Sequence, residues 1–242
     1  MKTTKIEWTE CVWDPSIGCD KVSDGCKFCY AEIFARRLKT MGLKDYQSGF
    51  EFKILPQRLE DPLKISRPTK FFVNSMSDLF HEKMPFEYLD KIFEVINKTP
   101  QHIYQILTKR ENRMFEYFST RDVLENAWLG VSVENAKFKN RIDVLKQINA
   151  AIRFVSFEPL IGPVGELDLT KINWAIVGAS RGKRQDPLEG NGWKKYFSNV
   201  KNKMWHFSLN NGVLGAKILS NATKKLTAEN SMAKNGVNIL YI

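Results

Sequence analysis

The sequence lacks any apolar run long enough to cross a membrane. A membrane-spanning helix needs roughly 18 to 20 apolar residues, and no stretch reaches that length. The charged start, MKTTKIEWTE, also lacks the apolar segment of a secretory signal peptide. With 43% hydrophobic side chains over 242 residues, the chain can nevertheless bury a sizeable core. We therefore expect a globular protein of the cytoplasm without membrane contact.

Acidic residues are scarce only toward the end of the sequence. Residues 179–242 contain 11 Lys and Arg against 3 Asp and Glu, whereas residues 1–178 contain 26 against 24. The net charge of +10 therefore divides into +8 and +2. The same final stretch shows neither helical nor strand periodicity. The character of the chain thus changes near Gly178.

Short apolar runs alternate with amphipathic segments before this point. Runs rich in β-branched and aromatic residues predict buried strands at 70–75, 103–109, 127–133, 152–158 and 173–178. Segments with apolar residues at three- and four-residue steps predict helices at 85–99, 110–120 and 135–149. This alternation predicts an α/β fold of parallel βαβ units, in a barrel or an open sheet.

Polar residues follow the carboxyl ends of four of these predicted strands. That end carries the site in parallel α/β folds, although Ser, Asp and Asn in such places also cap helices. Glu158, among apolar neighbours in FVSFEPL, would need a partner or a ligand if buried. We therefore predict a pocket lined by Ser75, Ser77, Asp78, Lys109, Arg110, Ser132, Glu134, Asn135, Ser156 and Glu158.

Cysteine is rare, and histidine is absent from the first 80 residues. Three of the four cysteines, Cys19, Cys26 and Cys29, lie in a C-x6-C-x2-C arrangement. Because cytoplasmic thiols stay reduced, metal ligands or catalysts are expected rather than disulfides. Three thiolates suit a 4Fe-4S cluster with one open iron, whereas zinc would need Cys11 as its fourth ligand. Reduced thiols without metal are the third alternative. His81 is expected at the surface of a helix start rather than as an acid or base.

Five blocks of sequence, in this order along the chain, carry a resemblance to a known family. They are TKIEWTECVWDPSIGCDKVSDGCKFCYAE, VNSMSDLFHE, TPQHIYQILTKR, WLGVSVEN and RFVSFEPLIGPV. Together they resemble a phage-encoded three-cysteine family of unknown function (the phage gp-thirty-seven/gp-sixty-eight group), often encoded beside a three-Cys-motif partner protein. The resemblance covers residues 4–178. That family is itself similar to the radical S-adenosylmethionine enzymes, which implies a partial (β/α)6 barrel over residues 1–178 with the cluster on the loop after the first strand.

The resemblance implies a role for each predicted site residue. Cys19, Cys26 and Cys29 would hold a 4Fe-4S cluster that binds S-adenosylmethionine, although the first gap is six residues rather than the usual three. Phe28 in CKFC would lie against the adenine. The remaining cofactor contacts would be Ser75, Ser77 and Asp78 to the ammonium, Lys109 or Arg110 to the carboxylate, and Ser132, Glu134 and Asn135 to the ribose, with Ser156 and Glu158 nearby.

Two functions follow from these alternatives. The first is an iron-sulfur enzyme that generates a 5'-deoxyadenosyl radical and modifies a nucleic acid, nucleotide or modified base, the substrate class that a phage or mobile-element origin suggests. The second is a zinc-stabilised module that binds nucleic acid without catalysis, with Trp8 and Trp13 stacking on bases. Against the second stand the near-neutral charge of residues 1–178 and the ordinary role of such aromatics in packing.

The final segment, residues 179–242, is predicted to be read in a shifted frame. Its charge changes, its periodicity stops, and the resemblance ends inside the apolar run NWAIVG. Codon degeneracy also allows Gly178-Ala179-Ser180-Arg181-Gly182 to encode Gly-Glu-Ser-Gly in another frame, a motif expected of the family. A divergent basic tail is the alternative. An unselected pattern should pack irregularly and weakly, and would make this chain a poor or inactive catalyst.

Overall fold

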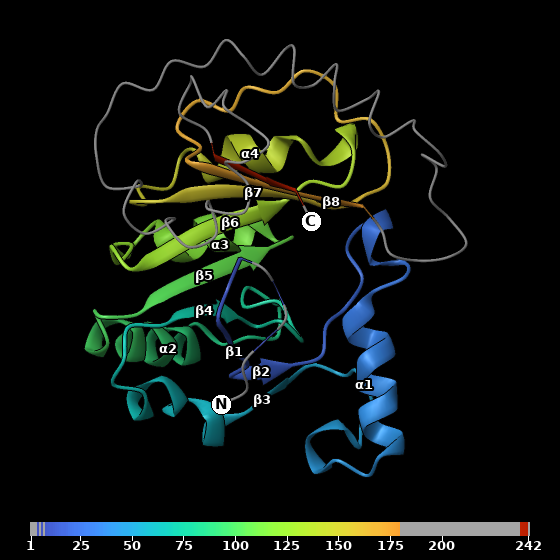
Figure 1. The fold of residues 1–242 in the computed structure, drawn as a ribbon, viewed down its shortest axis with the longest axis vertical. Helices are drawn as coiled ribbons and strands as arrows, with labels where there is room; N and C mark the ends of the chain where they lie inside the picture. Colours follow the sequence, from blue (N-terminus) through green and yellow to red (C-terminus); the bar gives the residue numbers. More distant parts are fainter. Residues whose placement is uncertain (1–3, 5, 7, 180–237, 242) are drawn as a thin grey trace, which may run out of the picture.

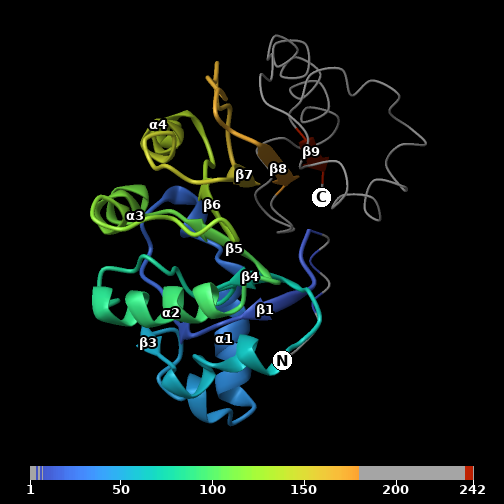
Figure 2. The same cartoon turned by 90° about the vertical axis from the view of Figure 1, so that its left-hand side faces the viewer.

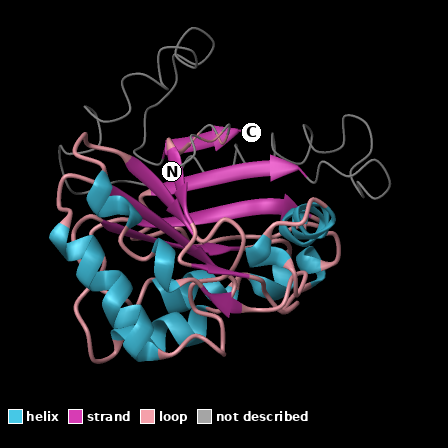
Figure 3. Ribbon diagram, turned by 90° about the horizontal axis from the view of Figure 1, so that it is seen from below, coloured by secondary structure: helices cyan, strands magenta, loops and turns pink. Residues whose placement is uncertain are grey.

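Seven parallel strands form an open sheet in the computed structural model, which describes residues 4, 6, 8–179 and 238–241 (Figure 1). They lie side by side in the order β1 (Cys11–Trp13), β4 (Lys70–Val73), β5 (Ile103–Thr108), β6 (Ala127–Ser132), β7 (Arg153–Leu160), β8 (Trp174–Ala179) and β9 (Asn238–Tyr241). Every neighbouring pair is parallel, so all carboxyl ends face one edge of the sheet (Figure 3). Within the described residues β1 and β9 do not pair, so the barrel is partial. All five predicted strands are confirmed.

Three helices cover one face of this sheet (Figure 2). They are α2 (Phe86–Lys98), α3 (Glu111–Phe118) and α4 (Asn140–Leu145). The first two confirm the predicted helices. The helix predicted over 135–149 is divided, because the Asn135 side chain accepts a hydrogen bond from the Lys137 backbone N–H (2.9 Å) and closes a 3-10 turn before α4 begins.

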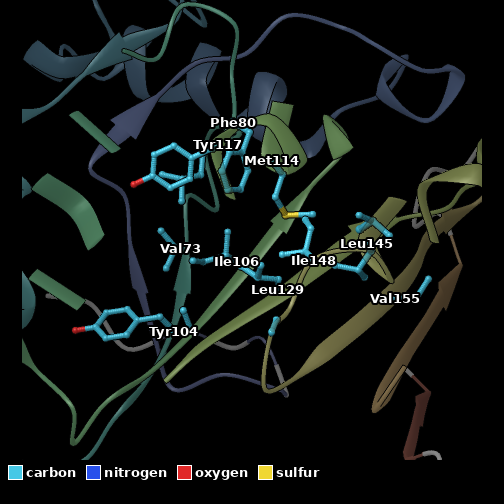
Figure 4. Packing of buried hydrophobic residues seen from close by; sticks show 14 of the residues in the cluster. Val73, Phe80, Tyr104, Ile106, Met114, Tyr117, Leu129, Leu145, Ile148 and Val155 are labelled. Carbon is cyan, nitrogen blue, oxygen red and sulfur yellow. The ribbon is translucent and has the colours of Figure 1, made fainter. Parts of the chain in front are cut away.

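The main core lies between these helices and the sheet (Figure 4). Val73, Ile106 and Leu129 occupy paired positions on adjacent strands, and all three are completely buried. Met114 of α3 and Leu145 of α4 pack in the same cluster. Because successive strand residues face opposite sides, the other face of the sheet carries a second set of apolar residues. That cluster includes Trp8, Phe72, Phe154 and Ile176.

The segment between β1 and β4 forms a separate layer beside the sheet. A two-stranded antiparallel pair joins β2 (Ser16–Ile17) to β3 (Lys53–Ile54), and α1 (Tyr30–Thr40) stands apart from the other helices (Figure 1). Its small core includes Ile17, Ala31, Ala35, Tyr46 and Leu55. Short 3-10 turns fill the connections of this segment at Asp24–Cys26, Lys44–Tyr46, Pro56–Arg58 and Asp61–Lys64, and a fifth, Ala136–Phe138, lies between β6 and α4.

Most of the segment predicted to be frame-shifted lies outside the described residues. Within 179–242, the structure describes Ala179 at the end of β8 and the strand β9, which pairs in parallel with β8. The predicted irregular packing of residues 180–237 therefore stays a prediction. In the part of the chain that the structure describes, no helix has the length and apolarity to cross a bilayer.

Candidate functional site

A cavity of about 1260 Å³ opens where the strands end, and the cysteine loop (residues 19–29) forms one of its walls. The loop follows β1 and β2, as the radical-enzyme resemblance implied. From the strand ends come most of the predicted site residues. The cavity is lined by Cys19, Cys26, Cys29, Phe28, Ser75, Ser77, Asp78, Lys109, Arg110, Ser132, Ser156 and Glu158, whereas Glu134 and Asn135 are not on its wall.

The backbone fixes both ends of the cysteine loop. Gly18 has a φ of 78°, and a Cβ there would lie 2.0 Å from the carbonyl oxygen of Glu51, so only glycine fits. Its N–H donates to the Met76 carbonyl at 2.9 Å, which ties the start of the loop to the end of β4. Cys29 is the N-cap residue of α1. None of the three loop thiols forms a disulfide within the described structure, and all three are partly buried.

Two cationic side chains reach the sulfur atoms. An Arg110 guanidinium nitrogen lies 3.4 Å from Cys19 Sγ, and Lys109 Nζ lies 3.9 Å from Cys26 Sγ. Burial raises the pKa of Cys19 to about 11, and the Asp78 carboxylate adds to that rise. Burial also acts to raise the pKa of Cys26, but Lys109 and Ser23 outweigh it and leave the pKa lowered. Cys26 therefore loses its proton to form a thiolate more readily than Cys19 does.

Asp78 organises the strand ends around the cavity. Its carboxylate accepts hydrogen bonds from Thr108 Oγ1 (2.6 Å) and from the backbone N–H groups of Lys109 and Phe80 (both 3.0 Å). Arg110 donates to it at 3.3 Å. A carboxylate has about four lone-pair sites, so these bonds occupy its capacity. In this structure Asp78 holds Arg110, while the ammonium contact predicted for Asp78 from the sequence stays a prediction.

Glu134 joins the cysteine loop to the sheet. Its side chain is completely buried, and it accepts from Ser23 Oγ at 2.5 Å, Lys109 Nζ at 2.8 Å and an Arg141 guanidinium nitrogen at 2.9 Å. Burial acts to raise the pKa of Glu134, but Lys109 outweighs it, and the pKa is lowered. A Cβ on Gly25 would lie 2.6 Å from the Glu134 Cγ, so the loop passes directly over this side chain.

These contacts do not match the ribose role predicted for Glu134 and Asn135. Two cations, Lys109 and Arg141, and the Ser23 hydroxyl surround the Glu134 carboxylate, which is not on the cavity wall, and Asn135 caps the following turn. The capping alternative therefore describes Asn135 correctly. Only Ser132 of the three predicted ribose contacts lines the cavity, and it is paired in register with Ser156.

The serines after β4 also hold the chain that leads into the loop. Ser77 Oγ donates to the Gly18 carbonyl at 2.7 Å, and Ser75 Oγ donates to the Asp14 carboxylate at 3.1 Å. Burial raises the pKa of Asp14, against the opposing effect of the Ser75 hydrogen bond. Both serines line the cavity while their hydroxyls face the segment that precedes the cysteines.

Glu158 is half-buried rather than enclosed by apolar neighbours. Phe157 takes the buried position on β7, and Glu158, the next residue, faces the cavity. Residues 154–157 of β7 are all buried, and the register with β8 shifts between Phe157 and Leu160, so Glu158 lies where the regular strand is interrupted at the cavity edge. The completely buried carboxylate of this site is Glu134 instead.

Cys11 and the N-terminal tryptophans belong to the core. Cys11 is a buried β1 residue in the main hydrophobic cluster and is not on the cavity wall, so it is badly placed to complete a zinc site with the loop. Trp13 is also buried and donates its indole N–H to the Arg58 carbonyl at 2.8 Å. Trp8 packs edge-on against Phe72 with ring centroids 4.7 Å apart. Packing accounts for the position of both rings, and Trp8 also contributes to the cavity wall.

His81 is buried, so its predicted surface position is wrong. Its ring stacks on Phe52 with centroids 4.1 Å apart, and its Nδ1 accepts from the Lys83 N–H at 3.1 Å. Nε2 lies 3.2 Å from the Asp20 carboxylate without the alignment of a hydrogen bond. Burial, and the charge of Arg110, lower the pKa of His81.

Three residues that sequence reasoning missed complete the site. Ser23 and Arg141 hold Glu134, and Tyr30 donates its hydroxyl to the Ser75 carbonyl at 2.5 Å. Ser23 and Tyr30 lie in and beside the cysteine motif, and that position was the only available signal. Arg141 lies on a predicted helix and carries no such signal.

A cavity walled by a three-cysteine loop lies at the carboxyl edge of an open parallel sheet, and this arrangement defines a partial α/β barrel. The chain belongs to the family described as Protein of unknown function (DUF5131), whose model matches residues 3–229. The match therefore extends past residue 178, where the sequence resemblance was expected to end.

Solved structures of spore photoproduct lyase share this fold. The lyase complexed with dinucleoside spore photoproduct aligns with a TM-score of 0.53 and 12% identity, over 100% of this chain and 79% of that chain. A double variant with bound AdoMet and the dinucleoside photoproduct aligns with a TM-score of 0.50 and 11% identity, over 98% and 78%. The likeness confirms the predicted fold class. No curated protein shows significant sequence similarity to the chain.

Proposed function

We propose that this protein is a radical S-adenosylmethionine-type enzyme whose Cys19, Cys26 and Cys29 hold a 4Fe-4S cluster. The observation that carries the proposal is the shared cavity: three thiols of one loop face it at the carboxyl ends of parallel strands, and cations contact two of them. When bound, such a cluster leaves one iron open for S-adenosylmethionine, and the pair supplies a 5'-deoxyadenosyl radical for hydrogen abstraction.

The residues present fit this cluster in number, chemistry and charge. Three thiolates and a cluster bring negative charge to the cavity, and Lys109 and Arg110 lie beside the sulfurs to stabilise it. Among the described residues no three Cys, His, Asp or Glu side chains already converge as a metal site. We therefore expect the cysteine loop to close by a small movement when the cluster binds, as coupling between metal binding and local folding allows.

The cavity also has groups suited to the cofactor's organic part. Phe28 offers an exposed ring on the wall for stacking on adenine. Lys109 and Arg110 are strand-end cations on the wall that suit a carboxylate, and Ser132 and Ser156 lie at adjacent strand ends and carry hydroxyls. Glu158, half-buried, is one of the acidic residues on the same wall, together with Asp24 and Asp78.

The proposed substrate is a nucleic acid or a nucleotide. Support comes from the two structural neighbours described above, which were solved with a bound dinucleoside spore photoproduct. A phage or mobile-element origin and a three-Cys-motif partner protein remain proposals from the sequence resemblance. They concern the biological setting and not the chemistry of the cavity.

Anaerobic reconstitution of the full chain with iron and sulfide tests the proposal. We expect about four iron atoms per chain and, after reduction with S-adenosylmethionine present, formation of 5'-deoxyadenosine. Cys26→Ala should lose both, whereas Cys11→Ala, a change in the strand core, should keep the cluster. A cluster that never cleaves the cofactor, or a colourless protein with one zinc that Cys11→Ala removes, would contradict the proposal.

We also propose that residues 179–242 are read in a shifted frame and that the chain as written is a weak catalyst. The support is the charge contrast and the loss of periodicity in that segment, and the family match that continues to residue 229 is the observation against it. The coding DNA decides: we expect an open alternative frame after the Gly178 codon, and a chain translated in that frame should form more 5'-deoxyadenosine. Stop codons throughout the alternative frame would show that the basic segment is genuine.

A further inference from the structure

Helix α1 presents an apolar face to solvent. Tyr30, Ile33 and Phe34 are 61%, 48% and 47% exposed, although the opposite side of the helix buries Ala31 and Ala35. Residues three and four apart lie on one side of a helix, so the three exposed side chains form one stripe. The outer side of a surface helix is normally polar. An exposed apolar stripe of this kind indicates a contact surface.

The stripe is continuous with the cavity. Phe28, which is 58% exposed, and Tyr30 both line the cavity wall, and the Tyr30 hydroxyl is held by the Ser75 carbonyl at 2.5 Å. Ile33 and Phe34 continue from there along α1, which stands clear of the other helices (Figure 1). A ligand lying on these side chains would therefore extend out of the cavity.

Cations flank the rings of this stripe. Lys27 Nζ lies 5.5 Å from the centroid of Phe28, and exposed Arg37 follows Ile33 and Phe34 by one turn on the same side of α1. Within the described structure neither Lys27 nor Arg37 has an ion-pair partner, whereas Arg36 on the adjacent side pairs with Glu32 at 2.6 Å.

The charged side chains on and beside α1 indicate which kind of ligand the stripe would bind. Glu32 is the single acidic residue of α1, and Lys21 and Arg36 already pair with it. The stripe therefore presents rings and unpaired positive charge without acidic side chains. A chain of stacked bases with a phosphate backbone complements this pattern, because aromatic rings stack on bases of any sequence while nearby cations attract phosphates.

We propose that this aromatic stripe, formed by Phe28, Tyr30, Ile33 and Phe34 with Lys27 and Arg37, binds single-stranded nucleic acid that leads into the cavity. The inference that the bound strand is a substrate rests on the proposed function. Binding itself does not, because it requires neither cluster nor cofactor.

Fluorescence anisotropy with a labelled, mixed-sequence single-stranded DNA oligonucleotide tests the stripe on the full chain without cluster. At an ionic strength of about 0.15 M, where exposed charges are largely screened beyond the Debye length of about 8 Å, Phe34→Ala should raise Kd at least about 5-fold through lost base stacking. Arg37→Ala should raise Kd and reduce the slope of log K against log salt by about 0.7. Phe115→Ala is the matched control, since this α3 ring is 38% exposed and lies outside the stripe.

The controls separate the stripe from other sources of binding. Residues 179–242, with 11 Lys and Arg, attract DNA equally in every variant, so the change caused by one ring is the informative result. Unchanged Kd for Phe34→Ala would overturn the proposal. So would a wild-type dimer in light scattering that the same substitution dissociates, since a second copy would then occupy the stripe. If Phe34→Ala leaves Kd unchanged while 5'-deoxyadenosine still forms, only the stripe proposal is overturned. If Phe34→Ala raises Kd but no 5'-deoxyadenosine forms, only the proposed enzyme function is overturned.

Discussion

Glu134→Gln is expected to loosen the cysteine loop and to weaken iron binding about 10- to 100-fold, the usual effect of losing a group that orients metal ligands. The substitution removes the buried charge that Lys109 and Arg141 share at 2.8 and 2.9 Å. Breaking a buried ion pair from one side costs about 3–5 kcal/mol of unfolding free energy. Lys109 would then lose the contact that fixes it near Cys26.

Iron content after reconstitution and hydrogen exchange of residues 19–29 measure the two effects separately. Glu111→Gln is the matched control, because Glu111 is the second carboxylate of Arg141, at 3.2 Å, and does not touch the cysteine loop. Both variants should lose stability, but only Glu134→Gln should speed exchange in the loop. Equal exchange in the two variants would show that Glu134 supports the core generally and does not anchor the loop.

The buried ion pairs of Glu134 predict how the stability of the cluster-free protein depends on pH. The pKa of Glu134 in the folded state is lowered, so its contribution to stability is complete above the pKa of a free glutamate, about 4.3. That contribution is lost as the pH falls through the lower folded-state pKa. Urea unfolding at several pH values should show a gap between wild type and Glu134→Gln that narrows below about pH 4. A gap that widens on acidification would contradict the assignment.

The sheet could be predicted because its signals are local. The five predicted strands contain short apolar runs whose periodicity needs no knowledge of distant residues, and α2 buries Tyr88, Leu89, Ile92, Phe93 and Ile96 at helical spacing. By contrast, α1 was not predicted. Its exposed side carries Tyr30, Ile33 and Phe34, which removes the contrast between polar and apolar faces on which such predictions depend.

The site could be predicted only at the level of its neighbourhood. Strand-end position correctly brought Ser75, Asp78 and Arg110 to one cavity, because parallel carboxyl ends share an edge. The contacts between individual side chains join residues far apart in the sequence, so no local pattern predicts them. Ser23 and Glu134, for example, are 111 positions apart. No local pattern distinguishes Glu134, a buried anchor, from Glu158, a residue on the cavity wall.

Asp78→Asn is expected to disable the cationic side of the cavity. The carboxylate now accepts hydrogen bonds from the Lys109 backbone N–H at 3.0 Å and the Arg110 guanidinium at 3.3 Å. The NH2 group of an asparagine is itself a donor and cannot accept these bonds. Both partners of the Asp78–Arg110 pair are nearly buried, so the loss should reach about 3–5 kcal/mol of unfolding free energy. Arg110 would also lose the contact that holds it 3.4 Å from Cys19, and iron binding should weaken with it.

Glu82→Gln is the matched control for this result. Glu82 is the other carboxylate near Arg110, at 3.8 Å, but its side chain is 72% exposed, and an exposed pair of this kind contributes about 0–1 kcal/mol. Urea unfolding and iron per chain should therefore change strongly for Asp78→Asn and little for Glu82→Gln. If Asp78→Asn loses stability yet retains wild-type iron binding and 5'-deoxyadenosine formation, Asp78 supports the fold alone, and the orientation of Arg110 is not needed for the cluster. Because the two variants alter carboxylates that approach the same guanidinium, the difference between them isolates the buried contact from the general loss of one negative charge.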